Sequence, residues 1–142
     1  MAFELTHLFG LEGVSREDIA TMLDTAASFR EVLDRPIRIV PTSVSKGESL
    51  RDTVRNIEAM KIDLIVTRHS SPGVPQFLAA HTSCRVINAG DGAHEHPTQA
   101  LLDMMTIRGH FGPLEGLKVL VVGDVLHSRV ARSDIWGLAT MG

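Results

Sequence analysis

The sequence predicts an α/β protein built on a parallel sheet with flanking helices. Short apolar segments alternate with longer segments of helical periodicity over most of the 142 residues. This alternation is typical of βαβ units, in which successive strands run parallel. A hydrophobic content of 44% is sufficient for one packed core and excludes a disordered chain.

The first predicted element is a helix that begins at Ser15. The Ser15 hydroxyl can cap this helix, and Asp18 stands three residues further on, as in a capping box. Pro36 ends the pattern, because proline disfavours helical geometry in the residue before it. The apolar residues that recur at helical spacing predict a packing face: Ile19, Met22, Leu23, Ala26, Phe29 and Leu33.

The remaining elements follow in alternation. Strands are predicted at 37–40, 62–66, 85–88 and 117–122, of which the last is the strongest. Helices are predicted from Glu48 or Ser49 onward and over 74–81, 97–110 and 128–140.

Composition excludes several classes of protein. The formal net charge is −3 without a long basic run, which argues against a nucleic-acid surface. Cys84 is the single cysteine, which excludes an internal disulfide and fits a reducing compartment. Apolar runs are too short for a membrane span, and the first residues lack the pattern of a signal peptide. We therefore expect a cytoplasmic protein that binds neither nucleic acid nor membranes.

Polar residues gather directly after three of the predicted strands. Arg68 and His69 follow the strand at 62–66. Residues 91–99 and 124–129 follow the strands at 85–88 and 117–122. Because ligands of parallel α/β sheets bind beyond the carboxyl ends of the strands, we expect these loops to form one rim.

The loop at 88–99 is the strongest candidate for a binding site. Two glycines permit a tight turn, and Pro97 suits the first position of the helix that follows. Free N–H groups at that helix start would face the same side as His96 and Gln99, which favours an anionic or carbonyl-bearing ligand. The alternative is an ordinary polar loop whose histidines are solvated.

Cations near this loop could bind an anion. Arg68 presents a planar fork suited to phosphate or carboxylate, although a surface ion pair is equally compatible with it. Arg129 and Arg132 lie near a helix start, where a cation is unfavourable unless an anion is bound. For Arg132 we favour exposure to water. Lys46 lies in a loop, where a lone lysine is usually solvated.

The sequence does not favour a metal or a cofactor. Asp91, His94, Glu95 and His96 cluster, but their spacing is not that of a helical zinc motif and no cysteine joins them. The residues after Gly123 lack the three-glycine spacing of a dinucleotide site. We therefore expect neither a metal nor a cofactor.

Several motifs, in the right order, resemble the catalytic chain of aspartate carbamoyltransferase. The resemblance covers nearly the whole chain but only part of the family's length. The motifs are HLFGL at 7–11, VSKGESLRDT at 44–53, RHS at 68–70, NAGDG at 88–92, HPTQALLD at 96–103, and GD at 123–124 followed by HSRVARS at 127–133.

The resemblance implies carbamoyl transfer from carbamoyl phosphate to L-aspartate, giving N-carbamoyl-L-aspartate and phosphate in pyrimidine biosynthesis. It implies that His96 stabilises the developing oxyanion, that Gln99 holds the carbamoyl amide, and that Arg68 neutralises the phosphate. Arg129 would bind an aspartate carboxylate. Lys46 would reach the aspartate site from a neighbouring subunit, because the family forms homotrimers with sites between chains.

The resemblance also implies two domains. Residues 1–111 would be a partial carbamoyl-phosphate-binding domain. Residues 112–142 would be a connector and the first βα unit of a second α/β domain, which binds aspartate. The chain would then be truncated before the loops that complete the aspartate site.

The sequence departs from the family within the first domain. The family's phosphate-binding signature, S-T-R-T-R at a helix start, is absent, and residues 40–43 join the segments that flank it in the family. Each lost charge-assisted contact to a dianion costs roughly 1.5–3 kcal/mol. We therefore expect an internally deleted chain with little or no activity and with exposed pairing edges on its sheet. The alternatives are a non-catalytic assembly or regulatory relative, an inactive fragment, or another transferase such as ornithine carbamoyltransferase.

Overall fold

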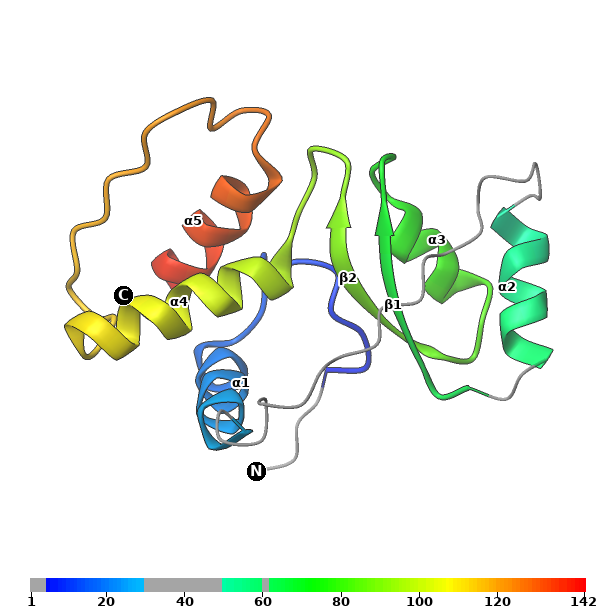
Figure 1. Cartoon of the computed structure of the whole chain (residues 1–142), viewed down its shortest axis with the longest axis horizontal. Helices are drawn as coiled ribbons and strands as arrows, with labels where there is room; N and C mark the ends of the chain where they lie inside the picture. The colour runs from blue at the N-terminus through cyan, green and yellow to red at the C-terminus, as the bar shows by residue number, and fades with distance from the viewer. Residues whose placement is uncertain (1–4, 30–49, 60–61) are drawn as a thin grey trace.

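The structure is a computed structural model that describes residues 5–29, 50–59 and 62–142 (Figure 1). Helices and a parallel sheet alternate in it, which confirms the predicted α/β class. The elements are α1 (Arg16–Phe29), α2 (Leu50–Ala59), β1 (Leu64–His69), α3 (Val74–Ala80), β2 (Arg85–Asp91), α4 (Pro97–Phe111) and α5 (Arg129–Met141).

The described part of the sheet is built around β2. β1 pairs with β2 in parallel, with a regular register from Leu64 opposite Arg85 to Thr67 opposite Asn88. On the other side of β2, the Leu8 N–H donates to the Val86 carbonyl at 3.0 Å. The outer edge of β1 pairs with no strand among the described residues.

Helix α1 begins as predicted. Ser15 Oγ accepts a hydrogen bond from the Asp18 N–H at 3.0 Å and donates to Asp18 Oδ2 at 2.9 Å. The hydroxyl therefore satisfies a backbone donor that has no partner within the helix. The predicted strand at 37–40 and Lys46 lie outside the described residues.

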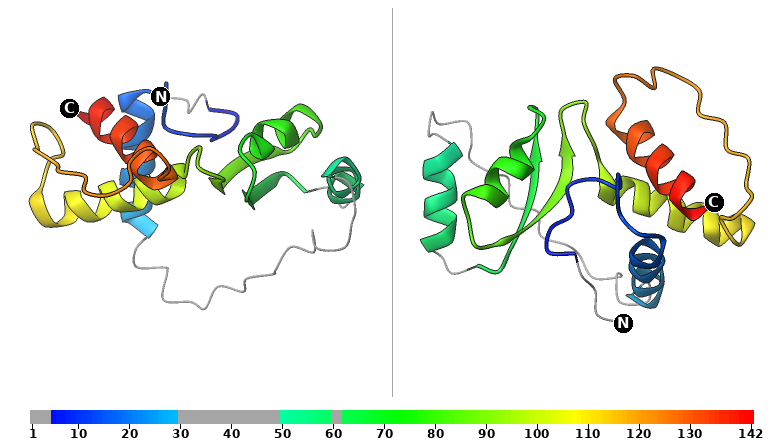
Figure 2. Two further views of the ribbon diagram at one scale, coloured as in Figure 1. Left: turned by 90° about the horizontal axis from the view of Figure 1, so that it is seen from above. Right: turned by 180° about the vertical axis from the view of Figure 1, so that it is seen from behind.

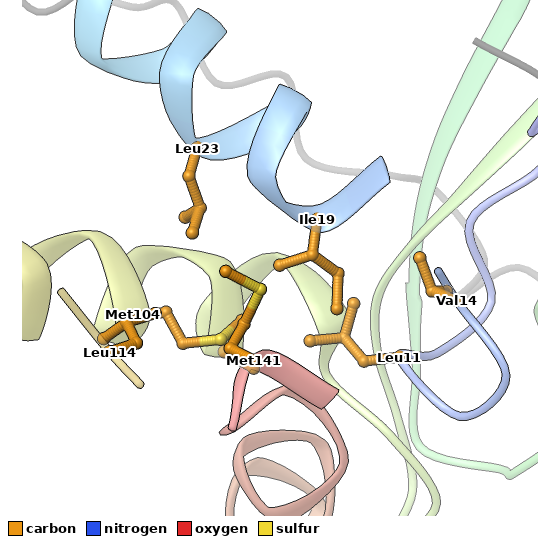
Figure 3. Close-up of a cluster of buried hydrophobic side chains, with 8 residues drawn as sticks. Leu11, Val14, Ile19, Leu23, Met104, Leu114 and Met141 are labelled. Atoms are coloured by element: carbon orange, nitrogen blue, oxygen red, sulfur yellow. The ribbon is translucent and has the colours of Figure 1, made fainter. Parts of the chain in front are cut away.

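Two groups of buried side chains form the core. One lies between α2, α3 and the sheet and consists of Val54, Ile65, Val74, Leu78, Cys84 and Val86. The other joins α1, α4 and α5 and consists of Leu11, Val14, Ile19, Leu23, Ala100, Met104, Leu114 and Met141, most of which are shown in Figure 3. Helix α5 is thereby packed against α4 rather than held apart from it.

The prediction of a strand at 117–122 is wrong. These residues form no strand, and the chain from α4 to α5 runs as an extended arc (Figures 1 and 2). Leu120 is 86% exposed and Val122 is 85% exposed. A strand needs a neighbour to pair its N–H and C=O groups, and the described part of the chain places none beside this segment. The expected βα unit of a second domain therefore contains its helix, α5, without its strand.

The other elements agree with the predictions to within a few residues. β1 and β2 each extend further toward the carboxyl end than predicted, so that β1 includes Arg68 and His69. Within the described ranges, every helix is too short or too polar to cross a membrane.

Candidate functional site

A bulge in β2 brings two predicted site residues together. The regular register breaks after Thr67, and the next pair joins His69 to Asp91, which leaves an extra residue in β2. Gly90 lies in this bulge with a φ of +112°. A Cβ at Gly90 would lie 3.0 Å from Arg129 Nε and 3.0 Å from His96 Cδ2. The absence of a side chain at this position lets the arginine and the imidazole pack against the backbone.

The loops that follow β1 and β2 meet at the carboxyl edge of the sheet. The Gly92 N–H donates to the His69 carbonyl at 3.0 Å. The Gly73 N–H donates to Asp91 Oδ2 at 2.8 Å. A Cβ at Gly92 would lie 2.7 Å from Pro72 Cδ, so the two loops are in close contact. The loops that follow β1 and β2 therefore lie together at one edge of the sheet, as predicted.

His96 is the N-cap of α4, and this role fixes its neutral tautomer. Its Nδ1 accepts a hydrogen bond from the Gln99 N–H at 3.3 Å. A ring nitrogen that accepts carries no proton, so the proton of the neutral ring is on Nε2. The His96 ring can therefore donate one hydrogen bond from Nε2 at the N-terminal end of α4.

The surroundings of His96 keep its ring neutral. Partial burial lowers the pKa of His96 below its ordinary value of 6.5, and the positive charges of Arg129 and Arg68 lower it further. The Asp103 carboxylate acts in the opposite direction, but it is outweighed. At neutral pH the imidazole is therefore an uncharged donor that experiences the positive charges of two guanidinium groups.

Arg129 reaches the rim from α5. The Ser128 hydroxyl caps α5 by accepting from the Ala131 N–H at 3.2 Å. Arg129 is the first residue of the helix, and its Nη1 donates to the Gly92 carbonyl at 3.2 Å. Figure 1 shows that α5 begins beside the turn between β2 and α4. The sequence predicts that Arg68, His96 and Arg129 share one rim. In the structure, the charges of Arg129 and Arg68 both act on the His96 ring.

Two carboxylates lie beside the rim and were not predicted. The Gln99 side-chain amide donates to Asp103 Oδ1 at 3.0 Å, within the first two turns of α4. Burial and the Asp103 charge raise the pKa of Asp134, on α5, from 3.8 to about 6. Asp134 Oδ1 is buried without a hydrogen-bond partner among the described residues. The meeting of Asp103 with Asp134 depends on helix packing, which no local motif signals.

The acidic residues of the 88–99 loop are engaged in hydrogen bonds within the protein. Asp91 is fully buried, and its carboxylate accepts from the Gly73 N–H, the Asn88 amide and the Glu95 N–H. Glu95 is 1% exposed and accepts from the Leu11 N–H at 2.9 Å. These carboxylates therefore stabilise the conformation of the loop, and no sequence pattern predicted that they would be buried.

Fold and site together define a parallel α/β domain with a cationic rim around a neutral histidine. Residues 32–109 match the family described as aspartate/ornithine carbamoyltransferase, carbamoyl-P binding domain. The chain therefore belongs to the aspartate/ornithine carbamoyltransferase family. This agrees with the resemblance seen in the sequence.

Individual relatives agree with the family match. The chain is 46% identical over 180 residues to the aspartate carbamoyltransferase catalytic subunit of Desulfotalea psychrophila, covering 99% of this chain and 57% of that protein. A crystal structure of aspartate transcarbamoylase from Trypanosoma cruzi, in complex with phosphate, matches with a TM-score of 0.81 and 26% identity. That match covers 93% of this chain and 55% of the other.

The chain spans little more than half the length of these relatives. The Geobacter sulfurreducens catalytic subunit is 45% identical over 182 residues, a region that accommodates all 142 residues of this chain. That relative therefore has residues inside the matched region without a counterpart here. This is consistent with the predicted internal deletion, whose expected position, 40–43, lies outside the described residues.

Proposed function

We propose that the rim binds carbamoyl phosphate and that the chain serves carbamoyl transfer to L-aspartate, a step of pyrimidine biosynthesis. The proposal rests on His96, whose Nδ1 accepts from the Gln99 N–H so that its proton is on Nε2, and whose ring lies within the electrostatic reach of Arg68 and Arg129. Carbamoyl phosphate carries a carbonyl oxygen beside a phosphate dianion. A neutral donor suits the carbonyl, and cations suit the phosphate.

The proposed chemistry follows from this arrangement. The α-amine of aspartate attacks the carbamoyl carbon and forms a C–N bond, while the carbonyl oxygen gains negative charge. The Nε2–H of His96 donates to that oxygen, where it stabilises the developing oxyanion. The C–O bond to phosphate then breaks, the leaving phosphate takes up the proton that the amine loses, and N-carbamoylaspartate and phosphate leave. His96 and Arg68 are the proposed catalytic residues, and Gln99 is proposed to hold the carbamoyl amide.

The acceptor is proposed to be aspartate, bound through one carboxylate by Arg129. A guanidinium at the rim next to Gly92 favours an anionic acceptor. Ornithine also carries a carboxylate, so transfer to ornithine is the second candidate. Lys46, from a neighbouring subunit of a homotrimer in the cytoplasm, is proposed to complete the aspartate site.

We expect the isolated chain to transfer the carbamoyl group slowly or not at all. The missing S-T-R-T-R segment would supply helix-start amides and two arginines to the phosphate. The loss of several such contacts, at roughly 1.5–3 kcal/mol each, would leave weak binding of the dianion. In that case the chain would act as a non-catalytic relative that retains part of the substrate site.

Calorimetry of the purified chain tests the proposal directly. Carbamoyl phosphate is titrated first, and aspartate or ornithine is then titrated into the saturated protein. We expect carbamoyl phosphate to bind, and aspartate to bind only afterwards. His96→Ala and Arg68→Ala should each weaken the first step, whereas the exposed Arg132→Ala on α5 should not. Absence of binding by the unaltered chain, or a preference for ornithine, would contradict the proposal in its present form.

A product assay and a mixing experiment separate the remaining alternatives. Formation of N-carbamoylaspartate at the rate of a full-length relative would refute the expected impairment. Co-purification with an intact catalytic trimer would favour an assembly or regulatory role. Sedimentation of the chain alone tests whether it forms the proposed homotrimer.

A further inference from the structure

A buried hydrogen-bond chain connects the backbone of His96 to two distant segments. The His96 N–H donates to Ser133 Oγ at 2.8 Å, and Ser133 Oγ donates to Glu95 Oε2 at 2.8 Å. The same oxygen of Glu95 accepts from the Leu11 N–H at 2.9 Å. Ser133 is 0% exposed and Glu95 is 1% exposed, so water does not compete for these bonds.

The Glu95 side chain has almost no freedom to move. A Cβ at Gly10 would lie 2.4 Å from Glu95 Cδ, so the backbone before Leu11 presses directly on the carboxyl group. The Glu95 N–H also donates to Asp91 Oδ1 at 3.2 Å. The carboxylate is therefore clamped between the N-terminal segment and the 88–99 loop, and its Oε2 is presented to α5.

Ser133 connects His96 to Arg129. The two α5 residues are four positions apart and therefore lie on the same face of the helix. On this face, Ser133 accepts the hydrogen bond of the His96 N–H. Arg129 places its guanidinium against Gly90 and Gly92. A shift of α5 would change the separation of Arg129 from the His96 ring.

We propose that Ser133 and Glu95 are positioning residues that set the His96 ring and the Arg129 guanidinium at their working separation. Neither side chain needs to touch the substrate for this role. The inference deepens the proposed function, because it concerns the same rim. It differs from a merely structural role in that it predicts a change at the His96 ring itself.

The first test measures the pKa of the His96 ring in the absence of any ligand. The charged groups that act on this ring are Arg129 from α5, Arg68 from β1 and Asp103 from α4. Ser133→Ala removes the hydrogen bonds that tie this face of α5 to His96 and Glu95, and we expect Arg129 to shift away from the ring as a result. We therefore expect the pKa of His96, measured by NMR titration, to rise toward its ordinary value of 6.5.

The control is a core variant that should lower the free energy of unfolding by an amount comparable to Ser133→Ala. Leu23→Ala removes a buried α1 side chain from the core group that joins α1, α4 and α5, and it leaves the hydrogen bonds of Ser133 and Glu95 in place. It should lower the free energy of unfolding and leave the pKa of His96 unchanged. The proposal is overturned if Ser133→Ala leaves that pKa unchanged, or if Leu23→Ala raises it equally.

Variants at Glu95 provide a second measurement in case Ser133→Ala does not fold. Both donors use the same oxygen of Glu95, so the amide oxygen of Glu95→Gln can accept both hydrogen bonds. Glu95→Met has a similar length but no such acceptor. We expect the His96 pKa to stay near the unaltered value in Glu95→Gln and to rise in Glu95→Met. Equal values in the two variants would contradict the proposal.

Binding of carbamoyl phosphate separates this inference from the proposed function. Ser133→Ala and Glu95→Met should bind it about tenfold more weakly than the unaltered chain, and Glu95→Gln should bind nearly as well. If the unaltered chain binds no carbamoyl phosphate but the His96 pKa shifts as expected, the proposed function fails and the positioning role stands. Weaker binding without a pKa shift would count against positioning.

Discussion

Gly90→Ala tests whether the bulge in β2 is what allows His96 and Arg129 to meet. The new Cβ would lie 3.0 Å from both Arg129 Nε and His96 Cδ2, so both side chains must move. The backbone φ of +112° is also unfavourable for alanine. Because Gly90 is buried, neither strain can be relieved by movement into water.

The expected loss of folding stability in Gly90→Ala has two parts. An unfavourable backbone conformation costs about 1–3 kcal/mol, and an overpacked contact costs a further 1–3 kcal/mol or so. We therefore expect Gly90→Ala to lower the free energy of unfolding by about 2–6 kcal/mol. Gly13→Ala is the matched control, because its φ is +76° and no described atom lies within 4 Å of the added Cβ. It should cost only about 1–2 kcal/mol.

Urea unfolding of the two variants measures this difference, and NMR titration of His96 measures its consequence. With Arg129 displaced, the pKa of His96 should rise in Gly90→Ala and not in Gly13→Ala. The reasoning is refuted if the two variants lose equal stability and the His96 pKa is the same in both.

Three further predictions concern charge and packing. Arg129→Ala should raise the pKa of His96 in an NMR titration and weaken phosphate binding in calorimetry, because a positive charge beside the ring is removed. Asp134→Asn should increase stability by about 1 kcal/mol at pH 8, because ionisation of a partly buried carboxyl is avoided and solvent screens part of its pKa shift. Gly137→Ala should lower stability by about 1–3 kcal/mol in urea unfolding, because the new Cβ would lie 2.7 Å from Met104 Cε.

Each of these predictions has a control. The pKa of Asp134 is raised from 3.8 to about 6, so the folded state binds a proton more tightly than the unfolded state. The unaltered protein therefore loses stability as pH rises from about 4 to 6, and the advantage of Asp134→Asn should vanish below that window. Gly109→Ala on α4 adds a Cβ with no described atom within 4 Å, and it should stabilise by about 0.5–1 kcal/mol. For the charge prediction, Arg132→Ala should leave the His96 pKa unchanged.

Local signals account for what the sequence predicted well. The Ser15 capping box, Pro97 at the start of α4 and Ser128 before α5 act within one helical turn. The contact between the loops after β1 and β2 was also predictable, because parallel strands end at the same side of a sheet. The family motifs identified the same rim without any knowledge of its geometry.

Local sequence patterns were thus sufficient to predict the helices and the parallel order of β1 and β2. That residues 117–122 pair with no described segment is a consequence of tertiary packing, since a strand takes its hydrogen bonds from another segment. Tertiary packing also decided the role of Glu95, which looks like a polar loop residue beside His96. Glu95 is buried because it contacts Leu11 and Ser133, which are 84 and 38 residues away from it in the sequence. Contacts over such separations depend on how the helices pack, and no local pattern of residues encodes them.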